Sequence, residues 1–170
     1  AGNAGVSKTV TEPTGGSVSF DKTAPDFTNT ANNSSITIVS DNESDDDLAY
    51  RLAIETDVIT LTLTSGEALK AATKPSVTIL GVSATVTANA NNTIFTATHT
   101  VTGDEAEIED QEVINFEISA GYSDASGNEG SEIIQESATV ANATLLTTDG
   151  TYVLYDISPP VLSRVRYKSN

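Results

Sequence analysis

Two short segments of this chain are rich in carboxylates, and their side chains are the residues best suited to bind a cation. They span residues 41–47 and 103–112. Calcium takes about six to eight oxygen ligands at about 2.3–2.6 Å, and flexible acidic loops supply such ligands. We therefore predict that these segments contribute to a calcium site. The candidate ligands are Asp41, Glu43, Asp45, Asp46, Asp47, Asp104, Glu105 and Asp156.

Other interpretations of the acidic residues stay open. Both segments also fit solvated loops that keep the surface acidic, and neither has the alternating acids, central glycine and closing glutamate of an EF-hand loop. A second arrangement joins Asp124 to Asp21 in an ion site at the pole where the chain enters the domain. The turn at residues 124–130 equally fits a structural role, because Asp and Asn cap their own backbone and glycine permits positive φ.

Residues that could support catalysis are scarce. The chain has one histidine and no cysteine, which excludes disulfides, thiolate nucleophiles and cysteine metal sites. His99 alternates with Phe95, Ala97 and Val101, so we expect its ring to face the core as an aromatic-sized filler. Zinc binding or nucleophilic catalysis would need a partner such as a second histidine or a nearby nucleophile, and the sequence offers neither. We therefore expect no enzymatic activity.

The net charge of −16 restricts the partners of the chain. Phosphate binding needs clustered lysine and arginine, so the acidic balance argues against nucleic acid. It also argues against an anionic membrane surface, and no apolar run approaches the roughly 20 residues of a membrane-spanning helix. The same charge favours solubility and divalent cations. We expect neither nucleic-acid binding nor membrane insertion in this fragment.

The spacing of apolar residues predicts that strands position these loops. In residues 57–64, Ile59, Leu61 and Leu63 lie on one face and threonines on the other. A period of two with β-branched residues is typical of a half-buried strand in an antiparallel sheet. Further strands are predicted at residues 36–40, 76–80, 83–88, 93–102, 113–119, 132–140 and 151–155, and one short helical turn at residues 66–72. This pattern predicts an all-β, immunoglobulin-like antiparallel β-sandwich.

Two stretches near the start of the chain recur near its end. Residues 1–5 return as residues 126–130, and residues 20–25 return as residues 155–160. Self-similarity over this distance indicates tandem copies of a whole domain. We therefore predict one repeat of a tandem array. Its parts are the tail of a preceding repeat at residues 1–20, a complete domain at residues 21–156 and the start of a following repeat at residues 157–170.

Several motifs occur in the order found in a known family. They are Asp-x-Thr-Ala-Pro at residues 21–25, the strand at 58–64 followed by Gly-Glu-Ala-Leu at 66–69, Pro-Ser-Val-Thr-Ile at 75–79, the strand at 95–102 and Tyr-Ser-Asp-Ala-Ser-Gly-Asn-Glu-Gly at 122–130. Over most of residues 20–160 the chain resembles the bacterial Ig-like repeats of long surface adhesins and extracellular matrix proteins. The resemblance implies an extracellular stalk or adhesive repeat, at the cell surface or in a matrix, without catalysis. The acidity of residues 41–47 and the longer last connection depart from it.

A sandwich of this kind gathers its loops at two poles. We expect residues 41–47 and 103–112 at the pole where the chain leaves, beside Asp156, where calcium would stiffen the joint to the next repeat. The positive residues of the full repeat are Lys22, Arg51, Lys70 and Lys74, and three of these four are expected at the opposite pole, which would then be positive. Neighbouring repeats, or copies of the chain, would then be its partners in a head-to-tail array, although each exposed ion pair contributes only about 0–1 kcal/mol.

Two alternatives to a stalk repeat follow from the sequence. One is a subunit of a self-assembling extracellular filament, in which residues 6–20 add as a strand to the exposed edge of a neighbour. The other is a carbohydrate-binding module. It is disfavoured because sugar-binding platforms use exposed aromatic rings, and the chain has five tyrosines, four phenylalanines and no tryptophan.

Overall fold

The computed structural model describes residues 20–42, 50–105 and 108–158. Within these ranges the chain is all-β and contains no α-helix. The strands are β1 (Ser35–Ser40), β2 (Tyr50–Ala53), β3 (Val58–Thr64), β4 (Val77–Ile79), β5 (Val82–Ser83), β6 (Thr85–Ala88), β7 (Ile94–Thr100), β8 (Glu112–Val113), β9 (Phe116–Ile118), β10 (Ile133–Gln135), β11 (Ala138–Thr139) and β12 (Tyr152–Tyr155). Two 3-10 helices, η1 (Thr30–Asn32) and η2 (Ala71–Thr73), lie in loops. In this part of the chain no helix has the length and apolar character needed to cross a membrane.

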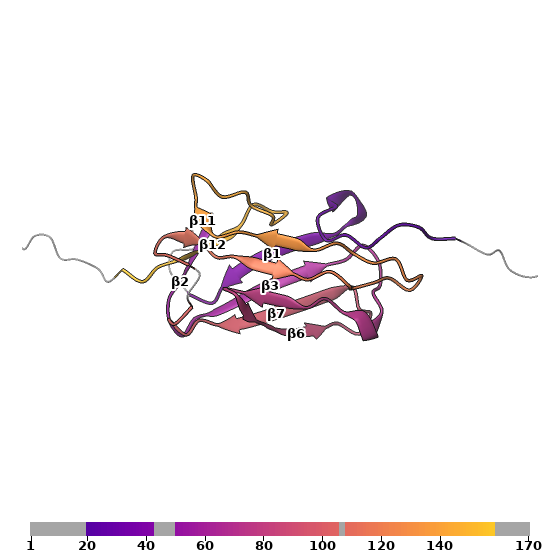
Figure 1. Cartoon of the computed structure of the whole chain (residues 1–170), viewed down its shortest axis with the longest axis horizontal. Helices are drawn as coiled ribbons and strands as arrows, with labels where there is room; N and C mark the ends of the chain where they lie inside the picture. The colour runs from indigo at the N-terminus through magenta and orange to yellow at the C-terminus, as the bar shows by residue number, and fades with distance from the viewer. Residues whose placement is uncertain (1–19, 43–49, 106–107, 159–170) are drawn as a thin grey trace, which may run out of the picture.

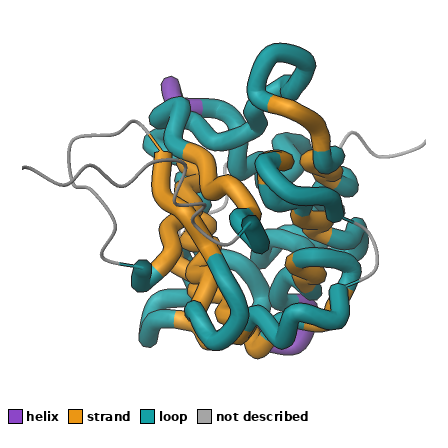
Figure 2. Tube along the Cα trace, turned by 90° about the vertical axis from the view of Figure 1, so that its left-hand side faces the viewer, coloured by secondary structure: helices purple, strands orange, loops and turns teal. Residues whose placement is uncertain are grey.

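The strands pack in two layers around a common core (Figure 1, Figure 2). One layer is a four-stranded sheet in the order β1-β3-β7-β6. The other combines two sheets, β10-β9-β4-β5 and β11-β8-β12-β2, which adjoin because only two residues separate β8 from β9. Among the described strands, pairing is antiparallel except between β2 and β12, which run parallel. This arrangement fits a β-sandwich.

The core lies between the layers because apolar residues alternate along the long strands. Ile59, Leu61 and Leu63 of β3 are fully buried. The register places Phe95 of β7 opposite Leu63 and Ala97 opposite Leu61, and both are fully buried. Fully burying a large apolar side chain contributes about 1.5–3 kcal/mol. The predicted period-two patterning of these two strands is confirmed.

An aromatic cluster joins the first described segment to the core. Phe27 is fully buried and packs against Phe95, with ring centroids 6.3 Å apart, and against Tyr122, with centroids 5.0 Å apart. The hydroxyl of Tyr122 donates to the backbone carbonyl of Ser131 at 2.9 Å. Burial raises the pKa of Tyr122 to about 12, with a smaller contribution from the charge of Asp26. The segment before β1 is therefore an integral part of the packed domain.

Several predictions of secondary structure are wrong in detail. Residues 83–88 do not form one strand, because β5 pairs with β4 whereas β6 pairs with β7, so the chain crosses between the layers at Ala84. Residues 132–140 form two short strands, β10 and β11, and η2 overlaps only the end of the predicted helical turn. Strand β2 is not predicted by the sequence pattern. Its four residues form a strand because they pair with β12, a segment about a hundred positions later in the chain.

The described chain starts at one end of the long axis and finishes at the other (Figure 1). We refer to the end that carries Asp21 as the incoming pole and to the end that carries Asp156 as the outgoing pole. At the incoming pole, Nδ2 of Asn128 donates to the carbonyl of Asp21 at 3.3 Å. At the outgoing pole, the backbone N–H of Ile157 donates to Oδ1 of Asp110 at 2.9 Å. These contacts agree with the predicted grouping of the loops at two opposite poles.

Candidate functional site

Three carboxylates lie close together at the incoming pole. Among the described residues, they are the acidic side chains that are near enough to one another to share one metal ion. Asp21 precedes η1, Glu67 lies between β3 and η2, and Asp124 lies between β9 and β10. Each offers one carboxylate oxygen, and these oxygens lie within 4.8 Å of one another. Carboxylate oxygens suit a hard cation such as calcium or magnesium. We refer to Asp21, Glu67 and Asp124 as the acidic trio, and it could hold a metal ion.

Asp124 is the rigid member of the acidic trio. It is 1% exposed, and its Oδ1 accepts hydrogen bonds from the backbone N–H groups of Gly127 at 2.6 Å and Asn128 at 2.9 Å. Its Oδ2 accepts from Nδ2 of Asn128 at 2.7 Å. Burial acts to raise the pKa of Asp124, but the hydrogen bonds from Asn128 and Gly127 outweigh it, so the pKa lies below its usual value. The carboxylate is therefore held in place and ionised.

Glu67 is the member of the acidic trio whose ionised form is disfavoured by the negative charges around it. Burial raises its pKa, and the nearby charges of Asp124 and then of Asp21 raise it further. Like charges at this distance disfavour ionisation, whereas a bound cation would relieve the repulsion. The electrostatics of the acidic trio are thus those of a site that a cation would stabilise.

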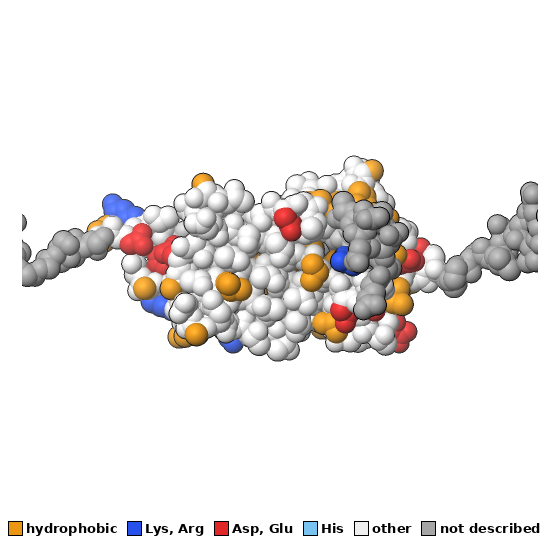
Figure 3. All heavy atoms as spheres, turned by 180° about the vertical axis from the view of Figure 1, so that it is seen from behind, with side chains coloured by type: hydrophobic (Ala, Val, Ile, Leu, Met, Phe, Trp, Pro, Cys, Tyr) orange, Lys and Arg blue, Asp and Glu red, His pale blue; other side chains and the backbone are white. Residues whose placement is uncertain are grey.

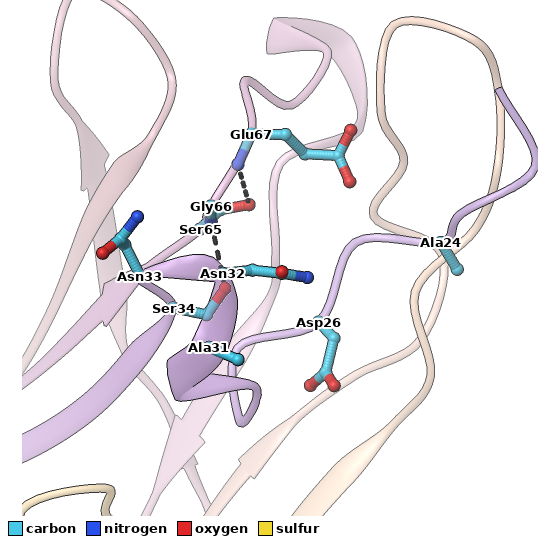
Figure 4. Close-up of a pocket in the computed structure, with 9 residues that line it drawn as sticks. All are labelled: Ala24, Asp26, Ala31, Asn32, Asn33, Ser34, Ser65, Gly66 and Glu67. Carbon is cyan, nitrogen blue, oxygen red and sulfur yellow. Dashed lines mark hydrogen bonds between the residues drawn. The ribbon is translucent and has the colours of Figure 1, made fainter.

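A polar hollow lies beside Glu67 (Figure 4). Its volume is about 320 Å³. The residues that line it are Ala24, Asp26, Ala31, Asn32, Asn33, Ser34, Ser65, Gly66 and Glu67. The backbone N–H of Gly66 donates to Oγ of buried Ser34 at 3.0 Å, which joins the loop after β3 to the start of β1. A side chain at Gly66 has no room, because an added Cβ would lie 2.2 Å from the carbonyl oxygen of Asn32. The position of Glu67 is therefore set by a close contact between two backbone segments.

At the outgoing pole, the predicted ligand Glu105 closes its own loop. Its Oε1 accepts from the backbone N–H of Thr102 at 2.7 Å and lies 3.0 Å from Nε2 of His99. Its Oε2 accepts from the backbone N–H of Gly103 at 2.8 Å. Burial acts to raise the pKa of Glu105, but the hydrogen bonds from Thr102 and His99 outweigh it and lower the pKa to about 2. This carboxylate is already fully engaged with protein donors.

The other predicted calcium ligands are dispersed. Oδ1 of Asp41 accepts from the backbone N–H of Val58 at 2.7 Å, and Oδ1 of Asp156 accepts from the N–H of Ser158 at 3.1 Å. Asp104 is exposed. Glu43, Asp45, Asp46 and Asp47 lie outside the described residues. Among the residues that the structure does describe, the predicted outgoing-pole ligands are not brought together into a group of three.

Sequence reasoning paired Asp21 with Asp124 as an alternative ion site, and the structure adds Glu67 to them. Glu67 was missed because the loop that carries it was interpreted as a helical turn without a functional role. Glu67 could have been found from its position in the loop between β3 and β4, because that loop lies at the same pole as residues 124–130. Asp110 was also missed as the residue that holds the outgoing segment, and no local pattern distinguishes it from the acids around it.

The two poles do not carry opposite charges. Lys22 and Lys70 lie at the incoming pole together with the acidic trio, so basic and acidic side chains are mixed there (Figure 3). The prediction of a positive incoming pole is therefore wrong, because Asp21, Glu67 and Asp124 gather there beside the lysines. Comparison with family models, with curated proteins and with solved structures found no match for this chain.

Proposed function

We propose that this chain is an extender module, an immunoglobulin-like β-sandwich that is joined head to tail with modules of its own kind in a long extracellular surface or matrix protein. One observation carries the proposal: the described chain begins at one end of the long axis and finishes at the other, so each added module lengthens the array (Figure 1). The sequence similarity of residues 20–25 to residues 155–160 supports it, because the same hinge then precedes and follows the module.

The immunoglobulin-like assignment draws support from the topology. The segment before β3 contributes to both layers, since β1 pairs antiparallel with β3 and β2 pairs parallel with β12. The remaining strands are divided between the two layers over one apolar core: β6 and β7 join β3, and β4, β5 and β8 to β11 join β12 in the other layer. Two packed layers of this kind are the architecture of an immunoglobulin-like sandwich. Two facing sheets of this kind form a stiff body, which suits a mechanical role.

No catalytic step is part of the proposal. His99, the single histidine, has its Nε2 against Glu105, and Glu105 holds the loop after β7. Asp124 is likewise committed to its own turn by Gly127 and Asn128. In each case the chemically capable group is used to fix a loop, which suits a structural module.

The extender proposal can be tested on a two-copy chain. The similarity of residues 20–25 to residues 155–160 sets the joining point, because Pro160 corresponds to Pro25 and is therefore followed by Asp26 of the second copy. We expect both copies to fold, with an unfolding enthalpy about twice that of one copy by calorimetry. A second copy that stays unfolded would contradict the proposal.

We also propose that the acidic trio binds calcium. Its support is the spacing of the three carboxylates, the fixed position of Asp124 and the raised pKa of Glu67. Binding to the folded state alone raises the melting temperature by mass action. A calcium titration followed by calorimetry tests this, and an unchanged melting temperature at millimolar calcium would contradict it.

A second function, assembly into a filament by strand exchange, has one observation in its favour. Phe20 is 78% exposed, whereas its sequence counterpart Tyr155, the last residue of β12, is 2% exposed. An exposed aromatic at the end of a β12-like segment is suited to occupy the β12 position of another copy. Sedimentation analysis over a wide concentration range tests this function, and a strict monomer would contradict it.

A further inference from the structure

We infer that the outgoing pole is a docking surface for the incoming pole of the following module, so that the joint between modules is a packed contact. The inference rests on the extender proposal and adds to it the surface, the occupant and the residues that hold the tether. Its occupant is the following module, whose start is expected at residues 157–170 and in which Pro159 and Pro160 are the sequence counterparts of Ala24 and Pro25.

The tether between the two modules is short. Tyr155 is the last buried residue of this module, and Pro25 is the first buried residue of the described chain. The counterpart of Pro25 is Pro160, five residues after Tyr155. Five residues span at most about 18 Å even when they are fully extended. The core of the next module must therefore begin close to the outgoing pole.

Most of this tether is already attached to the outgoing pole. The backbone N–H of Asp156 donates to the carbonyl of Ala53 at 2.9 Å, which continues the pairing of β12 with β2. Asp110 accepts hydrogen bonds from the N–H of Ile157 and from Oγ of Ser158. The hydrogen bonds from Ser158 and Ile157 also hold the pKa of Asp110 below its usual value.

Only Pro159 of the tether then remains before Pro160, the counterpart of buried Pro25. Both residues are prolines, and a proline ring restricts φ to near −65°. The residue before a proline is restricted as well, which disfavours the helical region for Ser158. A tether with so little freedom brings the two poles together in a narrow range of orientations.

The surface at this pole has the character of a contact site. A hollow of about 660 Å³ is lined by Ile54, Glu55, Gly103, Tyr155, Asp156, Ile157 and Ser158. Ile54 is 46% exposed and Ile157 is 57% exposed, so two large apolar side chains flank the tether. A contiguous apolar patch rimmed by polar residues marks a site of protein contact, and Ile54 and Ile157 line one and the same hollow. Because the incoming pole carries mixed charges, we assign the contact to these apolar groups and not to charge attraction.

The test is the rotational tumbling of each copy in the two-copy chain, measured by nitrogen-15 relaxation. Docked modules tumble as one body, so both copies should report the slow correlation time of the whole chain. Ile54→Lys in the first copy should shift both correlation times toward that of a single module. Ile134→Lys is the matched control, because Ile134 of β10 is 45% exposed and lies away from the hollow, and it should change nothing.

A second variant tests the tether itself. Asp110→Asn weakens the acceptor for Ile157 and Ser158, and we expect it to loosen the joint while each copy keeps its melting temperature. Two copies that fold but tumble independently without any substitution would overturn the docking inference and leave the extender proposal intact. A second copy that does not fold would instead contradict the extender proposal, so the two failures are distinguishable.

Discussion

Nε2 of His99 lies 3.0 Å from Oε1 of Glu105, and the two side chains are only 8% and 1% exposed. The contact joins a strand of the sandwich, β7, to the loop that follows it at the outgoing pole. The same carboxylate accepts from the backbone N–H groups of Thr102 and Gly103. Glu105, which was predicted to bind calcium, thus fixes the conformation of its own loop. Its partner His99 is the histidine that the sequence pattern assigned to the core.

The first prediction concerns the removal of the Glu105 carboxylate. Glu105→Ala leaves four partner groups without their acceptor, namely the N–H and hydroxyl of Thr102, the N–H of Gly103 and Nε2 of His99, and hydrogen bonds to charged groups contribute about 1.5–3 kcal/mol. We expect the free energy of unfolding in urea to fall by about 1–3 kcal/mol. Asp104→Ala, which removes an exposed charge from the neighbouring position, is the control and should have a much smaller effect. Equal losses in the two variants would contradict the role assigned to Glu105.

The second prediction is the pH dependence of the same contact. The pKa of Glu105 is about 2 in the folded protein, below its ordinary value of 4.5. Its contribution to stability is therefore complete above pH 4.5 and is lost as the pH falls from there through about 2. Glu105→Gln should abolish this part of the acid destabilisation, measured by urea unfolding over the same pH range. An unchanged pH profile in the variant would contradict the assignment.

The third prediction concerns Gly130, which lies against the ring of Tyr122. A Cβ at residue 130 would lie 2.0 Å from Cε2 of Tyr122, a distance that no packed structure tolerates. Because that ring is buried against Phe27, it cannot move aside freely. Gly130→Ala should lower the free energy of unfolding by about 1–3 kcal/mol or more. Ser126→Ala, in the exposed part of the same loop, should leave it nearly unchanged.

The fourth prediction gives Glu67 opposite effects with and without calcium. Its raised pKa means that its negative charge destabilises the folded state at neutral pH. Without metal, Glu67→Gln should therefore raise the melting temperature. With calcium, the same variant should lose most of the calcium-dependent rise, because one of three carboxylates is gone.

Glu129→Gln is the matched control for this experiment. Glu129 is an exposed acid near Asp124, so the change removes the same charge from the same pole without touching the acidic trio. We expect its calcium response to equal that of the unsubstituted chain. If Glu67→Gln and Glu129→Gln respond alike, general charge screening explains the calcium effect and the acidic trio is not its site.

The fold could be predicted from sequence where burial alone decides the pattern. In β3, Ile59 and Leu61 alternate with threonines because one face of that strand is buried against the opposite layer. The pattern failed at Ala84, where the chain changes layers without any break in its strand-like sequence. It failed also for β2, since that strand is created by pairing with distant β12.

The candidate site shows the same division. The sequence could place Asp124 and Asp21 at the same pole. Asp124 belongs to a turn rich in glycine and asparagine, Asp21 belongs to a proline hinge, and both kinds of segment occur at the ends of a domain. Glu67 joins them through the packing of Gly66 against Asn32, a contact between segments that no sequence pattern connects. The acid-rich segments of the sequence predicted the metal site at the outgoing pole. There, Glu105 and Asp110 instead accept hydrogen bonds that hold loop segments in place.

The central claim is that this chain is an extender module, and small-angle X-ray scattering of chains with one, two and three in-register copies tests it most directly. Because the described part of the chain starts and finishes at opposite poles, the maximum dimension should grow by the same increment with each added copy. A maximum dimension that stays near that of one copy, or that stops growing at the third, would show that the modules fold back on one another and would contradict the claim.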